Sequence, residues 1–415
     1  MKPFDPLVVF SENDRFAEFA RGRAECPVIK SSFPPMWNVL KYDDCVAVLR
    51  DPEHFASSPQ IALERAAANK NGTKSAVDLA RVFGSLPAIM RHMMVTTDPP
   101  DHQRLRSLVT RAFTPRMIAQ LEPRISGLSE ELIDDIEVKD SFDLMEDFAV
   151  PLPIYVIAEI LGIDPGMRRQ FKDWSNKMVL DPTGNMLMNA GRQPDLSWVG
   201  EFTSYFERLF DERRKRPMDD LISQLVMLEE SGDRLSGEEL LAMCGILLVA
   251  GNETTTNWLG NAFVAFTRFP WALRKLEQNP SLIPGAMEEV LRYYSPVQCL
   301  FRFAKPGACV GGQNIPAGES VLVWLQSAHR DGTVFERPDV FDIHRNPNPH
   351  IAFGNGIHFC LGAPLARLEA RIAMEKLVAR MPGIMRASDK SVRFRKSIML
   401  YGPDRLELAR QPRAA

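Results

Sequence analysis

The sequence predicts a mainly helical protein with a small β region, an α+β fold. One observation is a helical pattern from Ser236 to Phe269, with Ser236 as its cap and acidic residues in its first turn. Apolar residues surround most of this helix between Leu240 and Val249, which places it in the centre of the fold. The other observation is a late group of short strands, expected to be antiparallel, at 308–310, 313–315 and 320–324.

Shorter elements account for most of the remaining chain. A strand is expected at 36–40, and helices are expected at 11–21, at 42–50, from 98–101 onward, from Thr114 to about Ile136, after the turn at 162–165 and after Pro364. The basic run 213–216 is expected to be a solvated helix end. Two long irregular segments, 51–97 and 177–198, contain turn signals. Because no repeat or linker is visible, we expect a single domain over 1–415.

Composition limits the class of protein. The formal net charge of −3 gives no basic field, which argues against nucleic acid as the main partner. The six cysteines show no spacing typical of a zinc site or a disulfide framework, which fits a reducing compartment. The longest apolar run, 240–251, is shorter than the roughly 20 residues that a membrane helix needs, and the N-terminus lacks a signal pattern. We therefore expect a cytoplasmic protein without a membrane anchor, working as a monomer.

The run from Phe353 to Gly362, FGNGIHFCLG, presents one cysteine, Cys360, just before a predicted helix. Gly354 and Gly356 permit positive φ angles and close approach to a flat ligand. Unpaired N–H groups at a helix N-terminus lower the pKa of a thiol and stabilise a thiolate. The pattern therefore predicts a thiolate presented to a metal.

This motif resembles the haem-binding loop of the cytochrome P450 family. The resemblance implies haem b with its iron bound by Cys360, in a pocket whose cofactor contacts include Phe353 and Gly362. It further implies contacts from Ala250 and Gly251 of the long helix. The haem propionates would be neutralised by four basic residues, namely His102, Arg106, Arg302 and His358.

A local conflict inside the long helix indicates a functional position. Gly251 and successive threonines weaken a helix interior, the glycine alone by about 1 kcal/mol. We expect Gly251 to leave room for a ligand, and the Thr254 hydroxyl to bond to the helix backbone. By resemblance, Glu253 and Thr254 form the relay that delivers protons during oxygen activation.

Glu289 and Arg292 lie one helical turn apart and match the pair that supports the cysteine loop in this family. The chain departs from the pattern at Val340, where the third member of that network is normally basic. Either Arg345 or His344 is expected to substitute.

The resemblance implies a monooxygenase that inserts one oxygen atom of O2 into a lipophilic molecule, a terpenoid, steroid, fatty acid or polyketide. Its pocket would be almost wholly apolar, with Gln298 as a polar anchor. The expected lining is Met90, Val95, Ile246, Val249, Val297, Gln298, Leu300, Ile398, Met399 and Leu400. Segment 51–97 would be a substrate-access loop. For segment 177–198 two interpretations stay open, namely a mobile lid that contacts the substrate and core packing.

Electrons would come from a separate ferredoxin or flavodoxin with its NAD(P)H reductase. An acidic donor would dock on arginines around the cysteine side of the haem, namely Arg104, Arg111, Arg116, Arg367 and Arg371. Two alternatives stay open, a peroxide-driven or isomerising haem enzyme of the same fold and a non-catalytic haem-binding protein. Both are disfavoured by the Glu253 and Thr254 pair, which neither would need.

Overall fold

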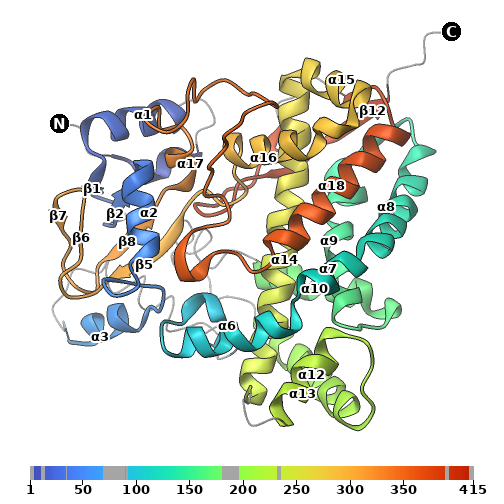
Figure 1. Cartoon of the computed structure of the whole chain (residues 1–415), viewed down its shortest axis with the longest axis horizontal. Helices are drawn as coiled ribbons and strands as arrows, with labels where there is room; N and C mark the ends of the chain where they lie inside the picture. The colour runs from blue at the N-terminus through green and yellow to red at the C-terminus, as the bar shows by residue number, and fades with distance from the viewer. Residues whose placement is uncertain are drawn as a thin grey trace.

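The fold consists of a helix-rich body and a smaller region that contains a sheet, seen at the right and left of Figure 1. The computed structural model describes residues 4–10, 15–33, 35–68, 89, 92–179, 196–230, 235–387 and 392–410. This arrangement confirms the predicted α+β class. In the described ranges, no helix is both long enough and apolar enough to cross a bilayer.

The predicted long helix is α14, Gly237–Arg268, which runs through the helical body (Figure 1). Its start is fixed by a capping box, as the Ser236 hydroxyl accepts from the Glu239 N–H at 3.1 Å and the Glu239 carboxylate accepts from the Ser236 N–H at 2.7 Å. The helices that pack against α14 include α9 (Pro151–Ile160), α10 (Arg168–Val179), α16 (Ile283–Tyr293) and α18 (Ala363–Arg380).

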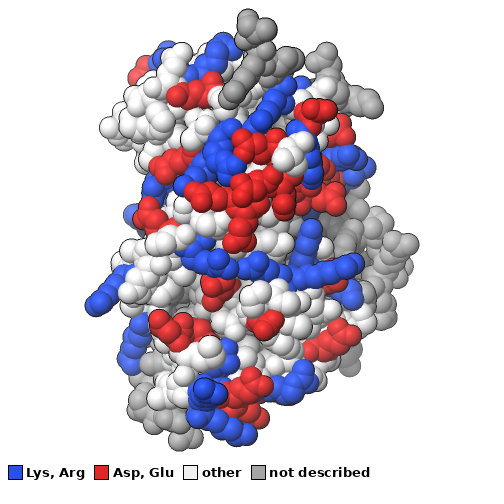
Figure 2. Space-filling model, turned by 90° about the vertical axis from the view of Figure 1, so that its right-hand side faces the viewer, with Lys and Arg blue, Asp and Glu red and all other residues white. Residues whose placement is uncertain are grey.

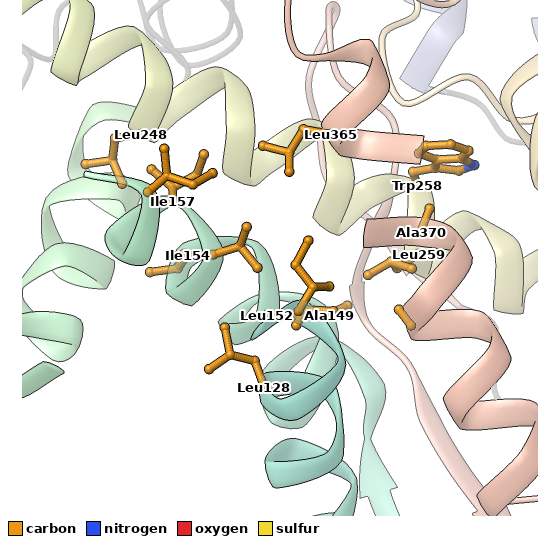
Figure 3. Packing of buried hydrophobic residues seen from close by; sticks show 14 of the residues in the cluster. Leu128, Ala149, Leu152, Ile154, Ile157, Leu248, Trp258, Leu259, Leu365 and Ala370 are labelled. Atoms are coloured by element: carbon orange, nitrogen blue, oxygen red, sulfur yellow. The ribbon is translucent and has the colours of Figure 1, made fainter. Parts of the chain in front are cut away.

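The main core lies where α8 (Glu122–Glu137), α9, α14 and α18 meet. Figure 3 shows Leu128, Ile154, Leu259 and Ala370 from these four helices directed into one cluster. All four side chains are fully buried. Burying a leucine or isoleucine contributes about 1.5–3 kcal/mol to the free energy of folding. The core therefore fixes the central helix, which carries one wall of the cavity described below.

Two predicted segments differ from the structure. The helix expected from Thr114 to Ile136 is two helices, α7 (Pro115–Gln120) and α8, because Pro123 in the first turn of α8 cannot continue the preceding hydrogen-bond ladder. The basic run at the end of α12 (Trp198–Lys215) is only partly solvated, since Arg213 is buried. Its guanidinium donates to Asp220 at 2.6 Å and to the Gly162 carbonyl at 2.9 Å.

The principal sheet has five strands in the order β1-β2-β8-β5-β3. Their bounds are Val28–Lys30, Trp37–Val39, Ser320–Val323, Leu300–Ala304 and Phe55–Ala56. Strand β8 is antiparallel to β5 but parallel to β2, so the expectation of purely antiparallel pairing is wrong for that strand. Early and late segments of the chain thus share one sheet.

Smaller elements complete the chain. Two of the predicted strands form the antiparallel pair β6 (Cys309–Val310) and β7 (Gln313–Asn314). Strand β12 (Glu407–Arg410) lies between β4 (Ser141–Asp143) and β9 (Ile384–Arg386) in a three-stranded sheet. Strand β10 (Arg393–Phe394) pairs with β11 (Pro403–Arg405). The other α-helices are α1 (Arg15–Glu25), α2 (Tyr42–Arg50), α3 (Gln60–Ala68), α6 (Asp101–Ala112), α13 (Leu221–Glu230), α15 (Pro270–Gln278) and α17 (Leu325–Ala328).

Short helical turns lie at Pro6–Phe10, Met94–Thr96, Met145–Ala149, Pro165–Met167, Pro280–Leu282 and Gly356–His358. The expected helix at 42–50 agrees with α2 at both ends. Most of the expected lid, residues 180–195, and much of the expected access loop, residues 69–88, 90 and 91, lie outside the described residues.

Candidate active site

The cysteine loop has the backbone geometry that its glycines predict. Gly354 and Gly356 have φ angles of 74° and 71°, in the region that favours glycine. A Cβ on Gly356 would lie 2.3 Å from the Leu49 carbonyl oxygen. The close approach at Gly356 is therefore to the end of α2, which corrects the expectation of close approach to a ligand at this position.

Cys360 lies at the end of this loop, three residues before α18 begins at Ala363. Its N–H donates to the Phe353 carbonyl at 2.9 Å, which closes the loop. Burial raises the pKa of the Cys360 thiol, although the N–H groups of Gly362 and Ala363 act in the opposite direction. The expected lowering of the pKa is thus wrong for the protein part alone, because removing the sulfur from water outweighs the helix terminus.

A cavity lies between α14 and the cysteine loop, and Cys360 lines it. Its lining is mostly apolar and comes from α14, α6, the loop and the segment before β5. Several predicted site residues meet there, namely Val95, His102, Arg106, Ile246, Ala250, Gly251, Thr254, Val297, Leu300, Phe353, His358, Cys360 and Gly362. Residues far apart in sequence thus form one site.

Basic side chains gather at one edge of the cavity. The rings of His102 and His358 lie 4.1 Å apart between centroids, and both ring nitrogens of His102 and Nε2 of His358 are buried without a hydrogen-bond partner. Burial, with Arg302, His102 and Arg106 nearby, lowers the pKa of His358 to about 3. Burial likewise lowers the pKa of Arg302 to about 10, which leaves it cationic at neutral pH. Unsatisfied ring nitrogens beside the buried Arg302 and the half-buried Arg106 fit a ligand that carries carboxylates.

The proposed relay residues face different surroundings. The Thr254 hydroxyl donates to the Ala250 carbonyl at 2.7 Å, which confirms the expected bond to the helix backbone. Glu253 does not line the cavity, and its buried carboxylate accepts from Arg395 at 2.5 Å. Arg395 also lies 3.6 Å from Asp404. Burial raises the pKa of Glu253, and the ion pair with Arg395 opposes that shift.

Gly251 serves a packing purpose. A Cβ at this position would lie 2.7 Å from Cδ1 of Ile157 on α9. The glycine therefore makes room for an isoleucine, and Ile157 in turn lines the cavity. This corrects the expectation that the missing side chain leaves space directly for a ligand.

The Glu289 and Arg292 pair, predicted to support the cysteine loop, is fully buried. Arg292 donates to both carboxylate oxygens of Glu289, at 2.7 and 2.8 Å. Arg345 completes the network, with Nε 3.2 Å from Glu289, while His344 is exposed. Val340 takes part in this network through its backbone, because its carbonyl accepts hydrogen bonds from Arg292 and Arg345 at 3.1 Å each. Of the two expected substitutes, the structure selects Arg345.

Part of the predicted substrate pocket lies elsewhere. Gln298 is 1% exposed, and its amide bonds to Arg15, to the Ser397 carbonyl and to the Leu400 carbonyl, so it is not a polar anchor for a ligand. Ile398 packs in a separate cluster with Phe19 and Trp324. Five predicted pocket residues that the structure describes do not line the cavity, namely Val249, Gln298, Ile398, Met399 and Leu400. Met90 lies outside the described residues.

Sequence reasoning missed several lining residues. They include Met94, Phe113, Ile157, Met243, Leu247, Thr255, Trp258 and Glu369. Met243 and Leu247 lie three residues before Ile246 and Ala250, and Trp258 lies four residues after Thr254, so helical periodicity contained part of the signal. Glu369 is fully buried with one carboxyl oxygen unpaired, and burial holds its pKa well above the usual range.

Comparisons with known proteins agree with this geometry. A family profile, Cytochrome P450, matches residues 170–403. The chain is 41% identical to the putative cytochrome P450 YjiB of Bacillus subtilis, across 87% of this chain and 85% of that protein. The chain belongs to the cytochrome P450 family. As a member of this family it is a haem-thiolate monooxygenase with haem b as its cofactor.

Two further comparisons carry chemical information about this P450's relatives. The polyketide biosynthesis cytochrome P450 PksS of Bacillus subtilis is 39% identical across 98% of this chain and 95% of that protein. CYP109E1 of Bacillus megaterium, solved in complex with testosterone, is 36% identical with a TM-score of 0.82, covering 96% of this chain and 99% of that one. The expected family, fold and reaction class are confirmed.

We predict that Arg345→Met lowers the free energy of unfolding by about 2–4 kcal/mol, because a fully buried carboxylate loses one of its two cationic partners. Urea unfolding at 25 °C measures the change. The matched control is His344→Leu, an exposed neighbour expected to stay within about 0.5 kcal/mol of the parent protein. Equal values for the two variants would contradict a structural role for Arg345.

Proposed function

We propose that this cytochrome P450 hydroxylates or epoxidises a medium or large lipophilic molecule, a terpenoid, steroid, fatty acid or polyketide. The observation that carries the proposal is one cavity whose lining runs from Cys360 to apolar side chains such as Ile246, Val297 and Leu300. The testosterone complex of CYP109E1 and the polyketide role of PksS support a ligand of this size and polarity.

Cys360 would hold the haem iron, and His102, Arg106, Arg302 and His358 would hold the propionates. Haem bound there supplies the activation of O2 and the transfer of one oxygen atom. The arginines provide the positive charge. The histidines, whose pKa values are lowered first by burial, provide neutral N–H donors. Other contacts to the cofactor would come from Ala250, Gly251, Phe353 and Gly362.

Protons would reach the cavity through Glu253 and Thr254. Thr254 lines the cavity, and its hydroxyl donates to the Ala250 carbonyl. The hydroxyl oxygen can therefore accept a hydrogen bond from a proton donor. Glu253 is held away by Arg395, which is partly exposed and adjoins Asp404. Its raised pKa favours uptake of a proton, and a protonated Glu253 loses its charge attraction to Arg395. We infer that Glu253 takes up its proton beside Arg395 and then presents it to Thr254.

An acidic electron donor would dock on the cysteine side of the molecule. Figure 2 shows one face on which Asp and Glu gather above a row of Lys and Arg. Among the predicted docking arginines, Arg104 pairs with Glu239, Arg367 pairs with Glu288 and Arg371 pairs with Glu122. Arg111 and Arg116 are both exposed, and we assign docking charge to these two side chains as well.

The remaining inferences concern the chain as a whole. A single domain over 1–415 is supported by the principal sheet, in which β2 from the early chain pairs with β8 from the late chain. The six cysteines are free thiols, which supports a reducing cytoplasm. The donor would be a ferredoxin or flavodoxin with its NAD(P)H reductase. Monomeric operation stays a prediction.

The substrate proposal is tested by titrating the purified ferric protein with steroids, terpenoids, fatty acids and polyketides. We expect at least one of these classes to shift the iron to high spin, because a bound apolar ligand displaces water from the cavity. Sugars and amino acids serve as controls and should give no shift. A flat response to all four classes, in a sample with thiolate-ligated haem, would contradict the substrate class.

We predict that Thr254→Ala lowers the product formed per reductant consumed by about tenfold, since a positioned proton donor typically contributes at least that much. Reductant consumption continues, and hydrogen peroxide accounts for the difference. Thr267→Ala is the matched control, because Thr267 makes a similar bond to its own helix, to the Val264 carbonyl, and is absent from the cavity lining. An unchanged ratio in Thr254→Ala would refute the relay and favour peroxide-driven chemistry.

We predict that Arg111→Glu together with Arg116→Glu raises the apparent KM for an acidic ferredoxin by about tenfold at low salt, because complementary charge steers the encounter. The rate at saturating donor should stay the same. Arg208→Glu on α12, also an exposed arginine, is the control for net charge. An equal KM in the double variant and the control would exclude this docking site.

A further inference from the structure

Two histidines outside the cavity bond to the chain just before the cysteine loop. The Ile351 N–H donates to Nε2 of His329 at 2.9 Å, and the Ala352 N–H donates to Nδ1 of His350 at 3.3 Å. Consecutive backbone donors are thus satisfied by side chains, where a sheet or helix would use carbonyl groups.

These contacts are directly connected to Cys360. Ile351 accepts from the Gly354 N–H at 2.9 Å, and Phe353 accepts from the Cys360 N–H at 2.9 Å. A shift of Ile351 or Ala352 therefore moves the carbonyls that fix both ends of the loop. The histidines act on Cys360 through the backbone and without touching it.

His329 can accept only as a neutral ring. It is fully buried, and the positive charges of its neighbours Arg292 and Arg330 disfavour a positive charge on its ring. Burial, followed by these neighbours, holds its pKa well below the usual value. With Nε2 accepting, the proton lies on Nδ1, which has no partner.

His350 is fixed in the opposite tautomer. Its Nε2 lies 3.0 Å from Glu288, and Glu288 also accepts two bonds from Arg367 at 2.9 Å each. The pKa of Glu288 falls to about 2 because the bonds from His350 and Arg367 outweigh its burial. The carboxylate therefore stays ionised and accepts from Nε2–H, which leaves Nδ1 free to accept from Ala352. Arg367 also stacks over Phe353, at 4.5 Å from the ring centroid.

We propose that His329 and His350 are positioning residues that hold the cysteine loop in its thiolate-presenting geometry, and that both must accept backbone hydrogen bonds for Cys360 to remain the iron ligand. This inference rests on the proposed role of Cys360. It extends the support of the loop beyond Glu289 and Arg292, because Arg292 donates to the His329 carbonyl at 2.9 Å and so joins the two networks.

The pH dependence follows from the sign of the His329 shift. An unfolded chain protonates histidine near pH 6.5, whereas folded His329 resists protonation. The contribution of neutral His329 is therefore complete above about pH 6.5 and is lost as the pH falls below it. His102 and His358 in the cavity also have lowered pKa values and contribute to the pH dependence. A substitution of His329 itself is therefore needed to isolate the contribution of His329.

The test uses pairs of variants in the haem-loaded protein. His329→Gln places an amide oxygen where Nε2 lies, and His350→Asn places one where Nδ1 lies, so both keep an acceptor that cannot be protonated. His329→Leu and His350→Leu remove the acceptor. The control is His344→Leu, an exposed histidine near the loop.

The readout is the absorption band of the ferrous carbon monoxide complex, which lies at longer wavelength when a thiolate is the opposite ligand. We expect the two leucine variants to hold at least twofold less thiolate-ligated haem at pH 7.5, with the amide variants and the control close to the parent protein. On acidification, His329→Gln should keep its thiolate to a pH about half a unit lower than the parent. Far-ultraviolet circular dichroism on the same samples separates loss of the ligand from general unfolding.

Two results would overturn the inference. One is an equal thiolate fraction in the leucine variants and the control. The other is a pH midpoint for loss of thiolate-ligated haem that is the same in His329→Gln and in the parent protein. If the leucine variants do not fold, this second result is sufficient to reject the inference. Failure of the proposed function looks different, because the parent protein would then show no thiolate band and would match Cys360→Ser.

Discussion

The central constraint is that a thiol must lose its proton inside an apolar cavity. Burial raises the pKa of Cys360, and the two N–H groups near its sulfur do not reverse the shift. With the proposed role of Cys360, a metal takes the place of the thiol proton, so that metal binding and deprotonation are coupled. The N–H groups of Gly362 and Ala363 favour the thiolate but do not outweigh burial, so with the proposed role of Cys360 the surrounding structure contributes mainly by holding the sulfur in position.

That requirement explains the rigidity behind the loop. Glu289, Arg292 and Arg345 form a buried network whose arginines donate to carbonyls of the chain before the loop, and the neutral rings of His329 and His350 accept its N–H groups. Buried ion pairs are weak evidence for stability, since desolvation offsets much of their attraction. Their value here is positional, because each fixes a backbone atom that a hydrophobic replacement would leave free.

Local patterns in the sequence were sufficient for the central helix, its cap, the cysteine loop and most of the basic residues at the cavity edge. Long-range contacts were not predictable in the same way. Arg395 lies 142 positions from Glu253, and Arg15 lies 283 positions from Gln298, so nothing in either neighbourhood indicates the bond. The direction of the Cys360 pKa failed for a similar reason, because it depends on burial by distant elements. Gly251 was correctly singled out, but its reason is the side chain of Ile157.

The histidines show how one residue type serves two opposite needs in the same site. His102 and His358 keep unpaired ring nitrogens at the cavity, where a neutral ring can donate to a carboxylate, while Arg106 and Arg302 carry the charge. His329 and His350 use a neutral ring to accept from the backbone. All four uses fail or change when the ring gains a proton. Charge in this site is therefore assigned to arginine, which stays protonated, and geometry to histidine, which burial keeps neutral at the cavity edge and at His329.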